Sequence, residues 1–190
     1  MEIKKINMIL DIKNLDIKGV KLFKLKSNKD NRGSFSEVFL SNLKIPEFKI
    51  NYVQENESLS NYGVFRGMHL QKGNHSQSKL IRVIKGKVID VVCDLRRSSS
   101  SFKKNIFIEL HPNQLLFLPK GLAHGFLSLE NGTILNYKCD NYYNDNAESG
   151  FNLFNSKVEV NFPIELDEII MSDKDMLLPD LDNSYIYQEL

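Results

Sequence analysis

Residues 79–95 read KLIRVIKGKVIDVVCDL, two apolar runs separated by Lys85-Gly86. In the second run, the apolar residues at odd positions 89–95 alternate with a mixed set at even positions 88–94. A period of two residues is typical of a β-strand with two distinct faces. The lysine–glycine pair predicts a tight turn, so we expect the two runs to form a β-hairpin.

Short apolar segments separated by turns continue on both sides of this stretch. The Asn131-Gly132 pair predicts a second hairpin, because Asn-Gly favours the turns that join antiparallel strands. Helical periodicity is scarce, and short helical turns are expected only at 167–171 and 172–178. Many short strands with regular turns predict an all-β sandwich or jelly roll with ligands bound between its sheets. Further strands are predicted at 20–25, 34–40, 106–110, 115–118, 126–129 and 133–138.

Length and composition exclude several classes of protein. The 190 residues suit one domain over 1–190, and 42% hydrophobic residues exclude a wholly disordered chain. A formal net charge of +1 argues against a nucleic-acid partner. No apolar run approaches the roughly 20 residues of a membrane span, so no membrane partner is expected. Cys93 and Cys139 both lie in strand-like segments, which favours free thiols in a reducing compartment and a cytoplasmic location.

Four histidines invite a search for a metal site. His75 and His111 lie in a polar loop and a turn, where we expect solvated side chains. His69 and His124 lie in apolar surroundings, and each taken alone is typical of a buried histidine with satisfied hydrogen bonds. Metal sites normally need three or more protein ligands, and Gln71 stands where a second histidine of the motif would be needed. We therefore predict no metal.

Seven stretches resemble one family, in its order and close to its spacing. The chain is identified as a relative of the nucleotide-sugar epimerases typified by dTDP-4-dehydrorhamnose 3,5-epimerase. The likeness covers roughly residues 18 to 180. The stretches are DNRGSFSE at 30–37, VQEN at 53–56, RGMHLQ at 66–71, QSKL at 77–80, DLR at 94–96, PKGLAHGF at 119–126, and NYK with NYY at 136–138 and 141–143.

This resemblance implies a fold and an activity. The fold is a cupin-type jelly roll with a core at about 18–165, on which the C-terminal segment 166–190 packs, with a few short helices near that end. The resemblance implies a homodimer without metal or organic cofactor. The implied activity is inversion at C3, C5 or both of a nucleotide-diphosphate-linked 4-keto-6-deoxy sugar, in deoxysugar biosynthesis for a surface glycan.

The chemistry of such a reaction needs three kinds of group. Inverting a carbon next to a ketone removes a proton from one face and returns one to the other, through an enolate. By similarity, His69 is the base and Asp175 is the carboxylate behind it. Tyr137 matches the acid on the opposite face, and Lys79 matches the cation at the enolate oxygen.

Ordinary structural roles compete with these assignments. Ser172-x-x-Asp175 also resembles the start of a helix, where an acid stabilises the N-terminus. Tyr137 taken alone is typical of a half-buried strand tyrosine. Lys79 taken alone is typical of a solvated surface lysine, as most lysines are.

The resemblance also implies a set of substrate contacts. Arg66 and Arg32 match positions near the diphosphate. Arg66 and His69 are three residues apart, so both face the cavity only if the strand bends at Gly67. We prefer Tyr142 over Tyr143 for stacking on the base. The remaining predicted contacts are Glu37, Gln54, Asn56, His124 and Lys174.

Several alternatives stay open. The motifs do not separate C3-only from C3/C5 epimerases, nor do they identify the sugar. Asn28 stands where the family typically has an aromatic residue near the base, so the base remains thymine, guanine or another. The alternative functions are a metal-dependent cupin oxygenase or isomerase using His69 and His124, and a sugar-nucleotide-binding cupin without turnover.

Overall fold

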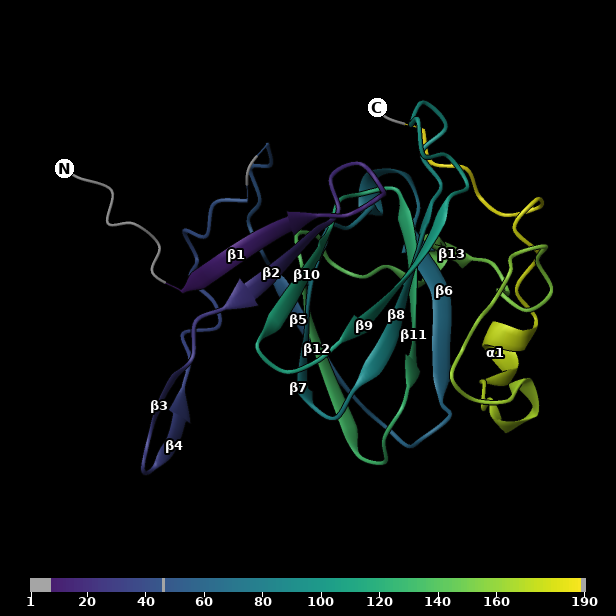
Figure 1. Ribbon diagram of the computed structural model, residues 1–190. Coiled ribbons are helices and arrows are strands. Elements are labelled where there is room, and N and C mark those ends of the chain that lie inside the picture. The colour runs from purple at the N-terminus through teal and green to yellow at the C-terminus, as the bar shows by residue number, and fades with distance from the viewer. Residues whose placement is uncertain (1–7, 46, 189–190) are drawn as a thin grey trace.

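Two β-sheets packed face to face form the body of the molecule (Figure 1). The computed structural model describes residues 8–45 and 47–188, and the counts here refer to these ranges. One sheet has six strands in the order β1-β2-β10-β7-β12-β5, and the other has five in the order β13-β6-β11-β8-β9. Neighbouring strands pair antiparallel throughout. The all-β prediction is confirmed.

The element bounds are as follows. The six-stranded sheet consists of β1 Ile9–Asn14, β2 Lys21–Leu25, β5 Gln54–Ser60, β7 Lys79–Lys85, β10 Gln114–Leu118 and β12 Thr133–Cys139. The five-stranded sheet consists of β6 Phe65–Gln71, β8 Val88–Asp94, β9 Asn105–Leu110, β11 Leu122–Ser128 and β13 Glu148–Gly150. A separate hairpin pairs β3 Asn28–Asp30 with β4 Gly33–Phe35. Short helical turns occur at Gly73–His75, Asp145–Ala147 and Leu166–Glu168, with one α-helix, α1, at Asp173–Met176.

The two predicted hairpins are wrong, although both turns exist. Lys85-Gly86 joins β7 to β8, but β7 pairs with β10 and β12 while β8 pairs with β9 and β11. Asn131-Gly132 likewise joins β11 to β12, which lie in different sheets. Each turn is a corner between sheets. Gly86 has φ +83° and a Cβ there would collide with Thr133, so the two corners pack closely.

The alternation predicted in β8 places its side chains on two cores. Val88 and Val92 belong to the cluster between the sheets. Val91, Cys93 and Leu95 belong to a second cluster, on the outer face of the five-stranded sheet. Because chain segments also cover the outer face of this sheet, β8 is buried on both sides. The same alternation directs the side chain of Asp90 inward, towards the space between the sheets.

Chain segments outside the sheets cover both outer faces. On the five-stranded sheet, Phe151, Phe162 and Leu181 pack into the outer cluster. The segment that follows α1 lies on the same side of the molecule as this helix (Figure 1). On the six-stranded sheet, apolar side chains of residues 38–45 and 47–50 pack against β2 and β10. The predicted strand at 34–40 is wrong beyond β4, because its later apolar residues pack on this face as irregular chain. The short helical turns predicted near the C-terminus are confirmed.

Candidate active site

A cavity opens between the two sheets, framed by β5, β7 and β12 on one side and β6, β11, β13 and α1 on the other. It has two chambers of about 230 Å³ and 310 Å³. Four residues line both chambers and so join them: His69, Lys79, Tyr137 and Glu148. Side chains from distant strands therefore meet around one space large enough for a sugar.

The predicted histidine–aspartate pair is present in this cavity. His69 Nε2 lies 2.7 Å from Asp175 Oδ1, and the backbone N–H of Gly67 donates to Asp175 Oδ2 at 3.2 Å. Burial opposes the charge on Asp175, but its hydrogen bonds and the nearby His69 lower the pKa of its carboxyl below the ordinary value. The pair orients the ring so that Nδ1 is the nitrogen left for the cavity.

The helix-start interpretation of Asp175 also holds. The Ser172 hydroxyl accepts a hydrogen bond from the Asp175 backbone N–H at 3.2 Å and caps α1. The cap uses the backbone of Asp175 while His69 uses its side chain, so the two interpretations are compatible. The cap fixes the carboxylate behind the imidazole.

The predicted bend at Gly67 is confirmed. In the pairing of β6 with β11, His124 faces His69 but Phe126 faces Arg66, so β6 carries an extra residue at this point. A Cβ on Gly67 would lie 2.5 Å from the Cα of Gly125, which requires glycine where the strands approach. As a result, both Arg66 and His69 line the larger chamber.

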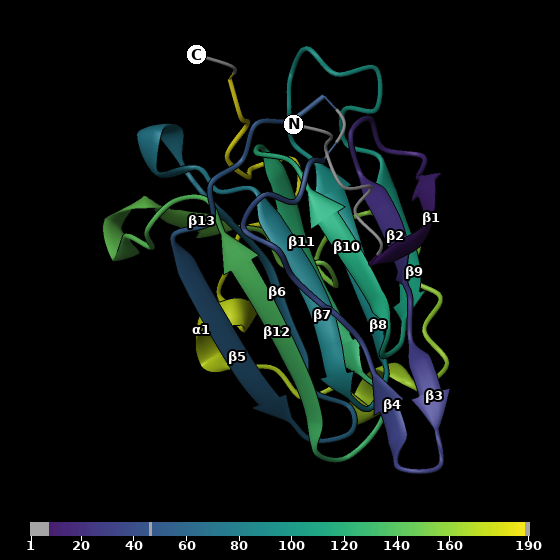
Figure 2. The same cartoon turned by 90° about the vertical axis from the view of Figure 1, so that its left-hand side faces the viewer.

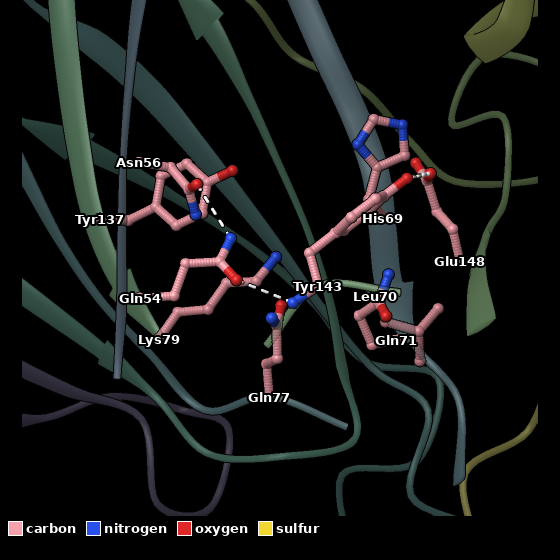
Figure 3. A pocket seen from close by; sticks show the side chains of 10 residues that line it. All are labelled: Gln54, Asn56, His69, Leu70, Gln71, Gln77, Lys79, Tyr137, Tyr143 and Glu148. Atoms are coloured by element: carbon pink, nitrogen blue, oxygen red, sulfur yellow. Dashed lines mark hydrogen bonds between the residues drawn. The ribbon is translucent and has the colours of Figure 1, made fainter. Parts of the chain in front are cut away.

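Tyr137 and Lys79 line the cavity from the opposite sheet. Figure 3 shows Tyr137 and His69 on opposite sides of the smaller chamber. The Lys79 Nζ lies 5.6 Å from the centre of the Tyr137 ring. Burial lowers the pKa of the Lys79 ammonium and raises the pKa of the Tyr137 phenol. The phenol therefore holds its proton at neutral pH, as a proton donor must.

His124 lies in the wall of the larger chamber, beside Phe126. Its Nε2 is 2.8 Å from Oδ2 of Asp90, whose side chain is fully buried. His124 is the register partner of His69 on the neighbouring strand. The structure thus brings two histidines with carboxylate partners to one cavity.

Polar residues of β5 and the loop after β12 form the far end of the smaller chamber. Gln54 donates from its amide to Asn56 at 3.0 Å and accepts from the Tyr143 backbone N–H at 2.8 Å (Figure 3). Tyr143 lines this chamber, whereas Tyr142 is 65% exposed and does not line it. The geometry therefore favours Tyr143 over Tyr142 as the aromatic contact.

Glu148 lines both chambers and was not predicted from the sequence. Its carboxylate accepts hydrogen bonds from the Tyr143 hydroxyl and from Lys174 Nζ, the latter at 2.5 Å. Burial opposes its charge, but these bonds lower the pKa of Glu148 below its ordinary value. The predicted Lys174 is thereby held at the edge of the larger chamber, beside His69.

Two predicted substrate contacts lie outside the cavity. Arg32 is at the tip of the β3–β4 hairpin, pairs with Asp30 at 2.6 Å and is 85% exposed. Glu37 lines a separate space of about 210 Å³ with Asn28 and Phe35. The hairpin stands away from the two sheets in Figure 1 and lies in front of them in Figure 2, so this chain does not bring either residue to its own His69.

Neither a cluster of metal ligands nor a membrane-spanning helix occurs in the part of the chain that the structure describes. Within residues 8–45 and 47–188, no group of three or more His, Cys, Asp or Glu is placed to hold a metal ion. Across the same ranges, no helix has the length and apolar character needed to cross a bilayer.

Comparison with known proteins identifies the family. The family model described as dTDP-4-dehydrorhamnose 3,5-epimerase matches residues 14–183. The chain belongs to the dTDP-4-dehydrorhamnose 3,5-epimerase family. One such epimerase, from Methanothermobacter thermautotrophicus, is 37% identical over 150 residues, which is 77% of this chain and 80% of the relative. A second, from Escherichia coli, is 36% identical over 157 residues, or 80% of this chain and 84% of the relative.

Solved structures of epimerases from this family share the fold. An enzyme from Bacillus anthracis, crystallised with TDP and PPi bound, is 36% identical with a TM-score of 0.84, over 90% of this chain and 99% of that one. An enzyme from Legionella pneumophila, in complex with dTDP-4-keto-L-rhamnose, is 29% identical with a TM-score of 0.88, over 95% and 98%. The cupin-type jelly roll and the isomerase class are confirmed, and none of these relatives supports the oxygenase alternative.

Proposed function

We propose that this enzyme inverts C3, C5 or both of a nucleotide-diphosphate-linked 4-keto-6-deoxy sugar, within deoxysugar biosynthesis for a surface glycan. The observation that carries the proposal is the placement of His69 and Tyr137 across one cavity, each at a position that matches the family. A base and an acid on opposite sides of a bound sugar are what inversion at carbon requires.

In the proposed mechanism, His69 removes the proton next to the ketone. Asp175 stabilises the imidazolium that forms, since its Oδ1 lies 2.7 Å from the ring Nε2. Lys79 stabilises the negative charge that develops on the ketone oxygen. Tyr137 then donates its proton to the opposite face of the carbon, and the inverted ketone is restored.

The remaining polar residues bind the nucleotide. Arg66 serves the diphosphate, because a guanidinium matches two phosphate oxygens at once. Tyr143 stacks on the base, and Gln54 with Asn56 contacts the base or sugar. Glu148 and Lys174 close the sugar end of the cavity.

We also propose a homodimer and a cytoplasmic location. Arg32 and Glu37 match substrate-binding positions but lie outside this chain's own cavity, and a second copy would supply them across an interface. Cys93 and Cys139 are both free and buried, which fits a reducing compartment.

Hydrogen exchange tests the proposal directly. The protein is incubated in deuterium oxide with dTDP-linked and other nucleotide-linked 4-keto-6-deoxy sugars, in the presence of a chelator. We expect deuterium at C3, at C5 or at both, which NMR distinguishes. Binding without label uptake from every such sugar would leave only the non-catalytic alternative. Exchange that a chelator abolishes would contradict the cofactor-free mechanism.

A further inference from the structure

The Asp90–His124 pair has no role in the proton transfers described above. Asp90 lies on β8 and His124 on the adjacent strand β11, so the pair is built into the sheet rather than supplied by a loop. The side chain of Asp90 is fully buried and that of His124 is 7% exposed. A buried carboxyl group behind a cavity histidine calls for a physical explanation.

The surroundings of Asp90 disfavour a bare negative charge. Its Oδ2 meets His124, but its Oδ1 has no hydrogen-bond partner among the described residues. Val88 and Val92, on the same face of β8, are both apolar and buried. Burial raises the pKa of Asp90, and the charges of His124 and Lys79 only partly oppose this. An unpaired anionic oxygen in such surroundings is unfavourable.

Hydrogen-bond chemistry then limits the states of the pair. An ionised carboxylate can only accept, so a neutral pair of this kind contains a doubly protonated imidazolium, with hydrogen on Nε2 and Nδ1. A protonated carboxyl group donates to Nε2, and the neutral imidazole then carries its hydrogen on Nδ1. Both neutral arrangements of the pair therefore place an N–H at Nδ1, the nitrogen not used by Asp90.

We propose that Asp90 is a positioning residue that keeps Nδ1 of His124 protonated, so that His124 donates a hydrogen bond to the oxygen that gains charge in the enolate. The inference rests on the proposed function and deepens it. Lys79 is the other group at that oxygen and lines the same chamber. As the enolate forms, the proton between Asp90 and Nε2 shifts towards the ring and brings positive charge nearer the oxygen, while the pair as a whole stays neutral.

Other charged and titratable groups act on the same space. Those that line the chamber beside His124 come from β6, β7, β12, β13 and α1; they are Arg66, His69, Lys79, Tyr137, Glu148, Lys174 and Asp175. Because several of them titrate, the protonation of His124 must be observed directly rather than inferred from an activity profile.

Nitrogen-15 NMR of the full chain provides this observation without substrate. The ring nitrogens of His124 are assigned by comparison with His124→Gln. We expect Nδ1 of His124 to carry hydrogen at neutral pH, and Asp90→Leu to restore a mixture of tautomers. An unprotonated Nδ1 in the native protein would overturn the proposal, whether or not the protein proves to be an epimerase.

Two substitutions at position 90 separate positioning from simple packing. Asparagine can donate from its amide to Nε2 and so preserve the Nδ1–H tautomer, whereas leucine fills similar space without a hydrogen bond. We expect Asp90→Leu to lower kcat for exchange by roughly 10²-fold with little change in KM, and Asp90→Asn to stay within about tenfold of the native kcat. If Asp90 served packing alone, leucine would equal or exceed asparagine, because it removes a buried unpaired oxygen.

A matched control lies on the same strand. Asp94 is also fully buried, but its carboxylate bonds Arg96, Ser99 and Ser101 and lines neither chamber. Asp94→Asn is expected to lower stability and leave kcat unchanged. Should both position-90 variants fail to fold, the tautomer measured in the native protein still decides the proposal.

Discussion

The two histidine–aspartate pairs of the cavity have nearly equal lengths, 2.7 Å for His69–Asp175 and 2.8 Å for His124–Asp90, but opposite surroundings. Both oxygens of Asp175 have partners, and the side chain of His69 is 31% exposed. Asp90 has one oxygen without a partner in the described part of the chain. Accordingly, the pKa of Asp175 is lowered and the pKa of Asp90 is raised.

This difference shows that a histidine and an aspartate can form either a base or a hydrogen-bond donor, depending on their surroundings. An anion behind His69 stabilises a proton arriving on the ring, which suits a base. A buried acid behind His124 keeps a hydrogen on the ring, which suits a donor. Environments that push two pKa values apart are how a site separates acid from base.

The largest expected effect follows from removing the base. His69→Asn should lower exchange by roughly 10²–10⁴-fold, because general-base catalysis at carbon contributes on that scale. Mass spectrometry of label uptake measures it. The exposed His111, which pairs with Glu109, provides the control, and His111→Asn should exchange normally. Equal rates of label uptake in the native protein and in His69→Asn would contradict the role assigned to the His69–Asp175 pair.

Removing the cation at the enolate oxygen should have the next largest effect. Lys79→Met is expected to lower kcat by roughly 10²–10³-fold, since one charge-stabilising donor is lost. Burial lowers the pKa of Lys79, so activity should also decline on the alkaline side before an exposed lysine would titrate. Lys120→Met, at a surface ion pair with Asp140, is the control. A pH profile unchanged by Lys79→Met would contradict the assignment.

Replacing a cavity residue outside both histidine–aspartate pairs should weaken substrate binding without changing kcat. Tyr143→Ala is expected to raise KM about tenfold with kcat retained, because stacking on a base contributes about 1–3 kcal/mol. Tyr142→Ala is the matched control, and we expect its KM to equal the native value. Steady-state kinetics distinguishes the two. A larger KM for Tyr142→Ala than for Tyr143→Ala would restore the assignment made from the sequence.

The smallest expected effects concern stability, and they have opposite signs in the two pairs. The folded-state pKa of Asp175 is lowered, so its stabilising contribution exists above its ordinary value of 3.8 and is lost as pH falls below it. The folded-state pKa of Asp90 is raised, so its contribution to stability falls as pH rises above 3.8.

Denaturant unfolding at several pH values measures this contrast. The loss in free energy of unfolding caused by Asp175→Asn should become smaller at acidic pH. Asp90→Asn should instead gain relative stability as pH rises. Parallel slopes for the two variants would mean that the two carboxyl groups do not differ in the way the geometry implies.

The strands with alternating apolar residues and the bend at Gly67 could be predicted from the sequence. It was misleading about the hairpins, because a period of two identifies the faces of a strand but not the sheet it joins. β5 escaped prediction, since QENESLS is polar and lacks the usual apolar alternation. Glu148 could not be predicted, because an isolated acidic residue after a loop belongs to no recognisable motif. Only the fold places it in the same chambers as His69.

The adjacent tyrosines show a further limit of sequence. Tyr142 and Tyr143 differ by one position, and only backbone direction decides which ring enters the cavity. Arg32 and Glu37 match the family motif, yet their place in the fold lies beyond this chain's own site. A motif identifies the residue, whereas its use depends on the path of the whole chain.

The single α-helix of the described chain has four residues and carries Asp175, which stands 106 positions from its imidazole partner. A helix so short has no independent stability and depends on its docking against the sandwich. Gentle warming can therefore release it while the sheets persist. Enzyme activity would be lost at a lower temperature than the β-sheet signal, so thermal inactivation reports the detachment of this short helix rather than the unfolding of the two sheets.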